Sequence, residues 1–411
     1  MLNDQQIDSI IVRAFDDWKI YGKRVLFIIP DNSRTAPIDQ IFRIVYNQLK
    51  DRASTVDFLI ALGTHPPLSE EQIYRRVGIS SDERCQQFPK ARFYNHRWNN
   101  PDHLVTIGTL SELEVGKLSE GRLSKAVPVT INRLIQHYEM LVIIGPVFPH
   151  EVVGFSGGNK YFFPGIAGPE IIDLFHWLGA LITSQKIIGQ KHTPVRAIVD
   201  AAARLISAEK RCFTLVVKSN GLAGMFAGTP EEAWSQAAEL SANEHVIYVK
   251  KSFQKVLAQA PEMYDDLWTG GKCMYKLEPI VADGGELIIY APHITEVSVT
   301  HGEIIEKIGY HVRDFFIKQW NIYKDFPGGI LAHSTHVKGS GQYENGIEKP
   351  RITVTLATGI PEAICRKINL AYLNPDSIDL NDYDNREVDG ILYVPKAGEI
   401  LYKLKENITI K

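Results

Sequence analysis

The chain of 411 residues is 45% apolar and 23% charged, an ordinary composition for a folded protein that excludes a disordered tail, a collagen or a long coiled coil. Its length predicts two or three domains. Lysine and arginine total 45 against 48 acidic residues, and this net charge of −3 gives no support to a nucleic-acid or membrane-surface partner.

Cysteine usage and the apolar runs predict a cytoplasmic protein. The four cysteines form no CxxC pair, and so few thiols in so long a chain fit a reducing compartment. Residues 1–18 carry charges throughout and lack the apolar core of a signal peptide. No uncharged apolar run reaches the roughly 18 residues of a transmembrane helix, so we expect no membrane span.

Strand-length apolar runs alternate with amphipathic segments through the first three fifths of the chain. The expected strands are Val25–Ile29, Val56–Leu62, Leu104–Ile107, Met140–Ile144, Phe213–Val217 and Val246–Val249. The expected helices are Asp4–Trp18, Ile38–Arg52, Ser69–Val77, Pro194–Ala208 and Pro230–Asn243. Ser69 and Gln72 form a capping box, which places a helix start directly after GTHPP. This alternation predicts βαβ units and a mostly parallel sheet.

A second set of elements follows. Phe253–Ala258 and Pro361–Asn369 are expected to be helices, the latter with proline in its first turn. Strands are expected at Glu286–Tyr290, Ile352–Leu356 and Gly390–Val394. We predict an α/β fold of two α/β domains with mostly parallel sheets, residues 1–252 and 253–411, with an active-site cleft between the domains.

The densest glycine punctuation lies in PHEVVGFSGGNKYFFPGIAGPEIIDLFH, from Pro149 to His176, directly after an apolar strand. Parallel sheets bind ligands beyond the carboxyl ends of their strands, so this position is a candidate site. Gly157 and Gly158 would let the backbone approach a bulky ligand. A tight-turning loop without a ligand explains these glycines equally well. The segment is neither a Walker A motif nor GxGxxG.

Three polar side chains of this segment have chemical potential. Lys160 lies among aromatic residues, where a lysine can become a nucleophile or an attachment point, or can simply extend to solvent. His150 and His176 flank it, and imidazole serves as an acid/base group or a metal ligand as well as a structural hydrogen-bonding group. His176 sits in an apolar helix, where an imidazole without a partner would be costly.

Other candidates follow the early strands. Asp31 and Arg34, in DNSRT, put a carboxylate and a guanidinium at the end of the first strand, or else form an Asx-turn beside a surface arginine. His96 ends a strand-like run, and His65 in GTHPP reads as a turn residue.

His333 and His336 form an HxxH pair in loop-like composition without a neighbouring Glu or Cys, which is weak support for a metal site.

The combination PH…GFSGGNK…PG…H, with DNSR, ALGTH and YNH upstream, resembles the lactate racemase family, whose members use a nickel pincer nucleotide. Lys160 follows His150 by ten residues, and His176 follows Lys160 by sixteen. The resemblance covers most of the chain and is strongest from Asp31 to His176. It implies that the cofactor is attached covalently at Lys160, that Gly157 and Gly158 leave room for it, and that His176 ligates nickel.

The resemblance also implies the groups that handle substrate. His96 and His150 match the two opposing acid/base histidines. Asp31 and Arg34 match the pair that orients a catalytic group and the substrate or cofactor.

The segment LWTGGKC places Lys272 at the lysine position near the substrate carboxylate, with Trp268 and Thr269 beside it. Trp268 stands where the family usually has tyrosine, and Thr269 where it usually has glutamine. A further tryptophan of the family aligns weakly with Phe326, and HSTHVKGSGQYENG has no counterpart that we can place. These departures favour a substrate other than lactate, such as a larger 2-hydroxy acid or a sugar acid.

The activity implied is an isomerase, a racemase or epimerase that inverts C2 of a 2-hydroxy carboxylic acid by moving hydrogen as hydride to and from the cofactor. Enzymes of pincer-cofactor biosynthesis would then be partners during maturation. A non-catalytic protein that binds a small carboxylate is the main alternative, since it would keep Arg34 without needing Lys160, His150 and His176 together. The sequence lacks the GxGxxG motif expected of a nicotinamide-dependent dehydrogenase. It also lacks any ATP-binding or thiol-donating motif that an enzyme of cofactor maturation would need.

Overall fold

The computed structural model describes residues 1–405, which form two compact units. The first unit comprises 1–148, 155–172 and 194–244, and the second comprises 149–154, 173–193 and the chain from residue 245 onward. Neither unit is a single continuous stretch. The division into domains 1–252 and 253–411, with a cleft between them, stays a prediction.

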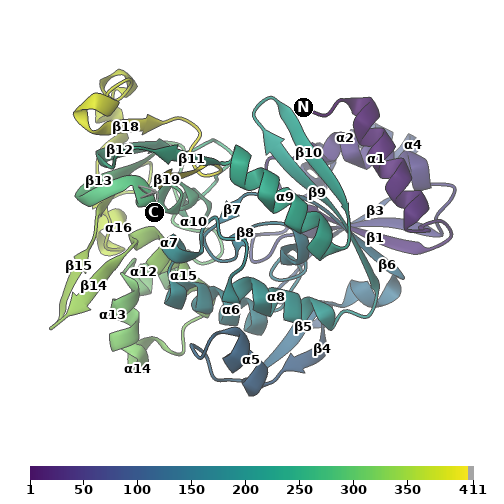
Figure 1. The fold of residues 1–411 in the computed structure, drawn as a ribbon, viewed down its shortest axis with the longest axis horizontal. Helices are drawn as coiled ribbons and strands as arrows, with labels where there is room; N and C mark the ends of the chain where they lie inside the picture. Colours follow the sequence, from purple (N-terminus) through teal and green to yellow (C-terminus); the bar gives the residue numbers. More distant parts are fainter. Residues whose placement is uncertain (406–411) are drawn as a thin grey trace, which may run out of the picture. The chain divides into compact units, whose positions relative to one another are not determined.

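The first unit is built on a six-stranded sheet (Figure 1). In spatial order its strands are β10 (Gly221–Gly228), β9 (Glu209–Lys218), β6 (Met140–Pro146), β1 (Arg24–Pro30), β2 (Thr55–Ala61) and β3 (Arg92–Asn95). Every neighbouring pair is parallel except the antiparallel β9–β10 hairpin. β6 is buried at every residue, which explains its uninterrupted apolar sequence.

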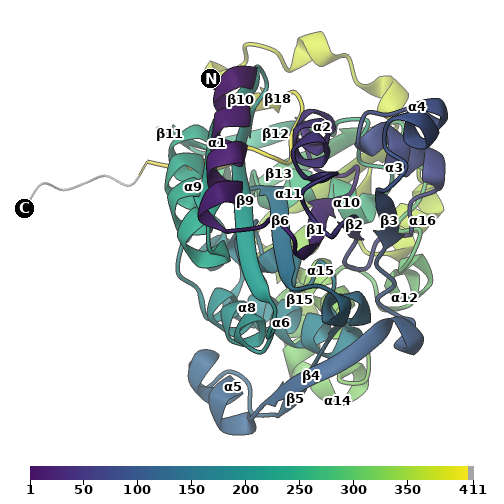
Figure 2. The same cartoon turned by 90° about the vertical axis from the view of Figure 1, so that its right-hand side faces the viewer.

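Helices cover both faces of this sheet. On one face, α1 (Asp4–Asp17) and α2 (Ile38–Leu49) contribute to a large core with Phe27, Phe58, Phe213 and Leu215 (Figure 2). On the other face, α9 (Pro230–Glu244) packs against Val216, the residue whose side chain points the opposite way from those of its neighbours in β9. The sheet is thus the central layer of a three-layer α/β unit.

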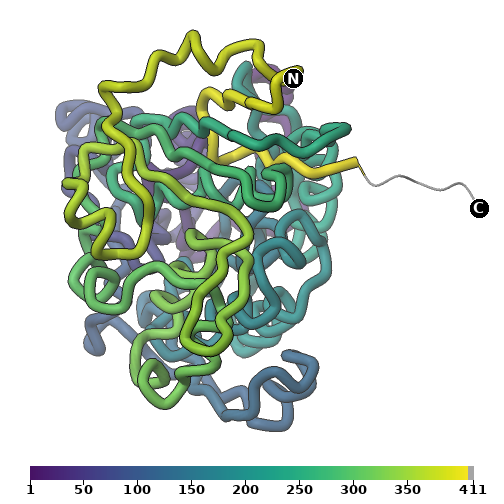
Figure 3. Tube along the Cα trace, turned by 90° about the vertical axis from the view of Figure 1, so that its left-hand side faces the viewer, coloured from purple at the N-terminus to yellow at the C-terminus, as the bar shows by residue number. Residues whose placement is uncertain are grey.

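The second unit has its own five-stranded sheet, parallel throughout. Figure 3 traces the path of this part of the chain in green to yellow. Its spatial order is β17 (Ala371–Tyr372), β16 (Thr353–Thr358), β13 (Val281–Ala291), β12 (Phe253–Gln259) and β18 (Ile391–Val394). The helix expected at Phe253–Ala258 is wrong, because this run is β12. A short apolar run has no decisive period, and here pairing with β13 and β18 on either side makes it a strand.

The other elements have the following bounds. In order they are α3 (Glu70–Arg76), α4 (Ser81–Gln86), β4 (Leu104–Leu110), α5 (Glu112–Leu118), β5 (Val127–Asn132), β7 (Pro149–His150), β8 (Gly154–Phe155), α6 (Pro169–Ile182), α7 (Ser184–Ile187), α8 (Pro194–Arg204), β11 (Val246–Val249), α10 (Leu267–Gly270), α11 (Lys272–Tyr275), α12 (Gly302–Ile308), α13 (Arg313–Lys318), α14 (Trp320–Tyr323), α15 (Gly328–Lys338), β14 (Gly341–Glu344), β15 (Ile347–Pro350), α16 (Glu362–Lys367) and β19 (Leu401–Leu404). Short 3₁₀ turns include η3 (Gly158–Tyr161).

Most predicted elements are confirmed. The Ser69–Gln72 capping box is formed and begins α3. The α/β class with mostly parallel sheets is confirmed as well. The loop expected around His333 and His336 is wrong, because both residues lie within α15. Within residues 1–405, no helix combines the length and the apolar character needed to cross a membrane.

A buried carboxylate ties two strands of the first unit to the segment that precedes β6. Asp57 on β2 is fully buried and accepts hydrogen bonds from Arg92 Nη2 at 2.7 Å and from the Tyr138 hydroxyl at 2.5 Å. Removing it would leave the Tyr138 hydroxyl without its acceptor.

We expect Asp57→Ala to lower the free energy of unfolding by about 2–4 kcal/mol, measured by urea denaturation. The matched control is Asp51→Ala, which removes an exposed carboxylate paired with Lys90 and should cost less than about 0.5 kcal/mol. Equal losses in the two variants would contradict a structural role for Asp57.

Candidate functional site

Three predicted or considered residues follow adjacent strands of the first unit. Asp31 comes directly after β1, His65 lies four residues after β2, and His96 comes directly after β3. Because β1, β2 and β3 are parallel neighbours, their carboxyl ends lie at one edge of the sheet. The fold therefore gathers these three side chains from segments far apart in the sequence.

Asp31 and His65 form a direct hydrogen-bonded pair. His65 Nδ1 lies 2.5 Å from Asp31 Oδ2, and Ser33 donates to Asp31 Oδ1 from both its backbone N–H and its hydroxyl. A carboxylate accepts, so Nδ1 carries the proton and Nε2 is left as the lone-pair nitrogen. The His65 side chain is 28% exposed and that of Asp31 9%. A buried carboxylate thus orients a partly accessible imidazole, the arrangement of a general base and its orienting group.

The charge state of Asp31 is fixed by its neighbours. Burial alone would raise the pKa of Asp31, but the nearby His65, its hydrogen bond, the Ser33 bonds and the Arg34 charge together hold that pKa well below the ordinary value. Asp31 is therefore ionised at neutral pH and accepts the hydrogen bond from His65 Nδ1.

Two arginines lie in the electrostatic surroundings of this pair. Arg34 and Arg76 both act on Tyr161, whose pKa is raised by burial. Arg76 on α3 donates from Nε to the carbonyl of Pro30, and its Nη2 is buried with no hydrogen-bond partner among residues 1–405. The end of β1 is thus cationic in character, which suits a carboxylate or phosphate group.

His96 has a different environment. It is 1% exposed, its Nε2 donates to the carbonyl of Ala167 at 2.9 Å, and its Nδ1 accepts from Asn132 Nδ2 at 3.1 Å. Burial lowers the pKa of His96 to about 4, although the bond to Ala167 opposes this. Both ring nitrogens are engaged inside the protein, so the imidazole holds segments together. Its predicted acid/base role stays a prediction, and the geometry favours His65.

The loop that carries Lys160 is shaped by its glycines. Gly157 and Gly158 have φ angles of 84° and 57°, which L side chains rarely adopt. A Cβ at Gly157 would lie 2.6 Å from Val147 Cγ2, and one at Gly158 would lie 2.8 Å from Trp234 Cβ. These glycines therefore let the loop pack closely on the protein, and any contact with a cofactor would come from their backbone.

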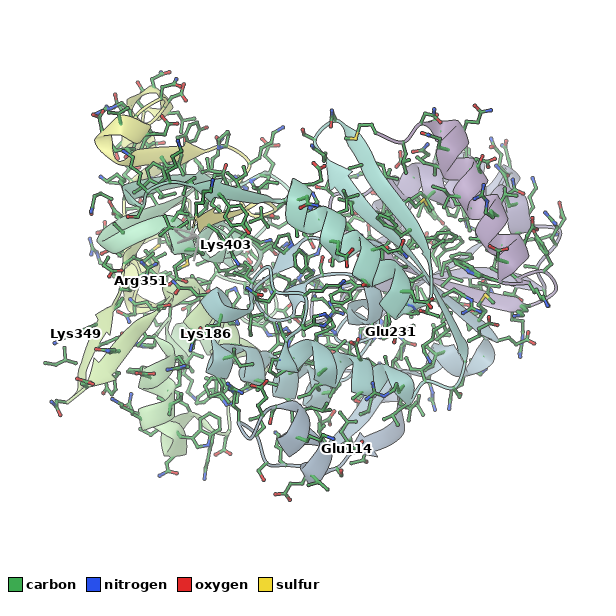
Figure 4. All side chains as sticks on the ribbon, in the orientation of Figure 1. Glu114, Lys186, Glu231, Lys349, Arg351 and Lys403 are labelled. Atoms are coloured by element: carbon green, nitrogen blue, oxygen red, sulfur yellow. The ribbon has the colours of Figure 1, made fainter. Side chains whose placement is uncertain are left out.

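Hydrogen bonds from buried polar side chains fix the loop that carries Lys160. Asn159 is 1% exposed and donates from Nδ2 to Asp200 at 2.9 Å and to Glu231 at 2.7 Å. Glu231 lies in the first turn of α9 and is labelled in Figure 4. The Trp234 indole donates to the carbonyl of Ser156 at 2.9 Å. Asn159, which precedes Lys160, and Ser156 earlier in the loop are thus fixed, while Lys160 itself is half-buried in η3.

His150 and His176 belong to the second unit. His150 is 6% exposed, and its Nδ1 accepts from the backbone N–H of Val152 at 3.1 Å, which leaves Nε2 as the proton-bearing nitrogen of the neutral ring. Glu151 Oε2 lies 3.3 Å from Nδ1 of the same ring. His176 is half-buried on α6, where its ring stacks on Phe175 at 4.5 Å.

The predicted substrate residues lie on two short consecutive helices of the second unit. Trp268 and Thr269 are on α10, and Lys272 opens α11. Asp266 caps α10 by accepting from the Thr269 N–H at 3.0 Å. Lys272 is 9% exposed, with its ammonium 4.6 Å from the centre of the Tyr264 ring. The ring of His333 stacks on Trp268 at 4.1 Å.

The sequence interpretation missed His65 and Arg76. A histidine after GT at the end of a strand reads as a turn residue, and its pairing with Asp31 depends on the parallel register of β1 and β2. Within residues 1–405, no group of three or more His, Cys, Asp or Glu side chains has an arrangement that could hold a metal ion.

Parts of the chain are similar in sequence to known proteins. Residues 8–189 match the family model of the lactate racemase N-terminal domain. The chain is 24% identical over 273 residues to the lactate racemase of Thermoanaerobacterium thermosaccharolyticum, covering 66% of this chain and 60% of that protein. It is 26% identical over 219 residues to that of Lactiplantibacillus plantarum, covering 52% and 46%. The matches thus span less than two thirds of the length of these curated relatives.

Two solved structures resemble the fold. A protein from Thermotoga maritima is 31% identical, with a TM-score of 0.90 over 98% of this chain and 99% of that one. The lactate racemase apoprotein of T. thermosaccharolyticum is 18% identical, with a TM-score of 0.72 over 97% and 93%.

The fold defines an α/β protein with the architecture of the lactate racemase apoprotein. Residues 8–189 match the lactate racemase N-terminal domain, and the chain is similar to two curated lactate racemases.

The environment of His96 predicts a pH dependence of stability. Its folded pKa of about 4 lies below the unfolded value of about 6.5, so the unfolded chain binds the proton first as pH falls. As the pH falls from about 6.5 to 4, proton binding to His96 in the unfolded chain therefore lowers the free energy of unfolding.

We expect His96→Gln to flatten this part of the curve of unfolding free energy against pH, measured by urea denaturation. His137→Gln, at an exposed histidine of the same unit, should leave the curve unchanged. An unaltered slope in His96→Gln would contradict the neutral, hydrogen-bonded state of His96.

Proposed function

We propose that this protein is an isomerase that inverts C2 of a 2-hydroxy carboxylic acid, using a nickel pincer nucleotide attached at Lys160. The observation that carries the proposal is the Asp31–His65 pair. A partly accessible imidazole oriented by a buried carboxylate can act as the general base that takes a hydroxyl proton. Similarity to the lactate racemase N-terminal domain and to two curated lactate racemases supports the reaction class. The particular acid is proposed to be larger than lactate, since Trp268 and Thr269 depart from the usual substrate residues.

His65 is the first proton carrier in this proposal. Its Nε2 lone pair takes the proton of the C2 hydroxyl as the carbon is oxidised, and the ionised Asp31 stabilises the resulting imidazolium. His150 is the second carrier in this proposal and serves the opposite enantiomer. Two carriers are needed because hydrogen leaves one face of the carbon and returns to the other.

The residues present suit the proposed cofactor. Lys160 supplies an amine on a loop that hydrogen bonds fix at Asn159 and Ser156, which is what a covalent attachment requires. Imidazole is a suitable ligand for nickel, and His176 supplies one. When bound, the nickel pincer nucleotide would accept and return the C2 hydrogen as hydride. Enzymes that build this cofactor are then partners in maturation, and the cytoplasmic location stays a prediction.

The substrate carboxylate is assigned to cationic side chains. Arg34 can offer two parallel N–H donors to a carboxylate, and Lys272 offers a nearly buried ammonium. A non-catalytic carboxylate-binding protein would need these two residues but not the Asp31–His65 pair, so the geometry favours the isomerase.

Cofactor attachment is tested by co-expression with enzymes of pincer biosynthesis. We expect the wild type to show a nucleotide-sized increase in intact mass and near-stoichiometric nickel, and Lys160→Ala to show neither. Lys186→Ala removes an exposed lysine on α7, labelled in Figure 4, and should load like the wild type. Absence of adduct and nickel in the wild type, under conditions that load a known family member, would exclude the cofactor assignment.

The assignment of the proton carrier is tested on loaded protein. We expect His65→Ala to lower kcat/KM for isomerisation by about 10²–10⁴-fold. The two directions should fall equally, because the equilibrium constant of the reaction fixes their ratio. Asp31→Asn should lower kcat and leave nickel content unchanged. A large loss in His96→Ala beside normal turnover in His65→Ala would reverse the assignment.

A further inference from the structure

His333 has an unusual position for an imidazole. It lies in the middle of α15, it is 8% exposed, and residues 330–337 of this helix are all buried. Buried polar atoms in folded proteins are almost always hydrogen-bonded. Both ring nitrogens of His333 are therefore expected to have hydrogen-bond partners. Among residues 1–405, only Nε2 has one.

The hydrogen bond of His333 fixes its tautomer. Its Nε2 lies 2.9 Å from the backbone carbonyl oxygen of Trp268, and a carbonyl can only accept, so Nε2 carries the proton. Nδ1 is then a lone-pair acceptor. It is buried and has no hydrogen-bond partner among residues 1–405. A group that donates a hydrogen bond is missing at this atom.

The surroundings connect this acceptor with the predicted substrate residues. The rings of His333 and Trp268 are nearly parallel, with centroids 4.1 Å apart and an angle of 16°. A Cβ at Gly271, between Trp268 and Lys272, would lie 3.2 Å from His333 Nε2. The α10–α11 segment thus approaches α15 closely at His333, one residue from the lysine assigned to the carboxylate.

The charge of His333 limits what it can bind. Burial lowers the pKa of His333 to about 3, with the Trp268 hydrogen bond opposing and the nearby His336, His301 and His176 adding to the effect. The ring is therefore neutral at physiological pH. A neutral acceptor does not attract a second carboxylate, but it pairs with a hydroxyl, and the flat face of an aromatic ring packs against the C–H groups of a carbon chain.

Resting on the proposed function, we propose that His333 is a specificity-determining residue whose Nδ1 accepts a hydrogen bond from a substrate hydroxyl beyond C2. In this arrangement Lys272 meets the carboxylate, and His333 meets the hydroxyl further along the carbon chain. The substrate class is then a 2-hydroxy acid with at least one further hydroxyl, in preference to a plain 2-hydroxy acid or a dicarboxylic acid.

Two substitutions at His333 separate its two nitrogens. His333→Gln keeps an N–H donor in reach of the Trp268 carbonyl and removes the acceptor at the Nδ1 position. His333→Asn keeps an amide oxygen near the Nδ1 position and gives up the bond to Trp268. His336→Gln is the matched control, because His336 is buried on the same helix and its pKa is also lowered to about 3, but its ring lies against Tyr275.

The substrates form a matched series on loaded protein: 2-hydroxybutanoate, its 3-hydroxy and 3,4-dihydroxy derivatives, and malate. We expect the wild type to prefer one of the hydroxylated acids to 2-hydroxybutanoate by about 10–100-fold in kcat/KM, which is the effect of one buried hydrogen bond. His333→Gln should remove this preference while its activity on 2-hydroxybutanoate stays within about threefold. His336→Gln should keep the preference, and His333→Asn should keep part of it.

Binding of the same acids, measured by calorimetry and as shifts in melting temperature, gives a readout apart from turnover. Equal binding of hydroxylated and plain acids, or a preference that survives in a folded His333→Gln protein, would overturn the role of His333 and leave the isomerase intact. The first of these results is also the one expected if a bound water satisfies Nδ1. Failure of nickel-loaded wild type to isomerise any acid would instead overturn the proposed function, and the binding series would still decide the role of His333.

Discussion

The hydrogen bond between Asp31 and His65 is the interaction on which the proposed chemistry depends. It exists because β1 and β2 are parallel neighbours, so that the segments following both strands lie at the same edge of the sheet. Burial would keep the carboxyl of Asp31 neutral, and the contacts with His65, Ser33 and Arg34 reverse that tendency. The ionised, nearly buried carboxylate then accepts the hydrogen bond from His65 Nδ1 and orients the imidazole, as a proton carrier requires.

The loop of Lys160 illustrates a second constraint, which is close packing of backbone against side chains. Gly157 and Gly158 adopt positive φ angles, and the space where their side chains would lie is filled by Val147 and Trp234. Asn159 adds hydrogen bonds to two carboxylates from α8 and α9. A cofactor lysine has four rotatable bonds, so a rigid backbone is the means by which a protein limits where its amine can reach.

In the second unit, α15 carries two buried histidines, His333 and His336. A buried imidazole stays neutral, so it offers one donor and one acceptor without charge. His333 uses its donor within the protein and leaves its acceptor without a protein partner. An acceptor of this kind costs stability when it is unpaired, and a ligand that supplies the donor recovers that cost.

The sequence alone was enough to predict the fold class, most of the elements and the resemblance to lactate racemases, because short apolar runs, a capping box at Ser69 and the spacing of His150, Lys160 and His176 are local properties. It was wrong about Phe253–Ala258, whose apolar run has no decisive period until β13 and β18 pair with it. It misjudged the His333–His336 segment as a loop, because a helix buried on all sides lacks the alternation that marks a surface helix. Only the tertiary structure distinguished His65 from His96. Both follow strands, but Asp31 contacts one ring, whereas Ala167 and Asn132 occupy both nitrogens of the other. Strand register and loop packing determine the hydrogen-bond partners of a histidine. The residues next to it in the sequence do not determine either of them.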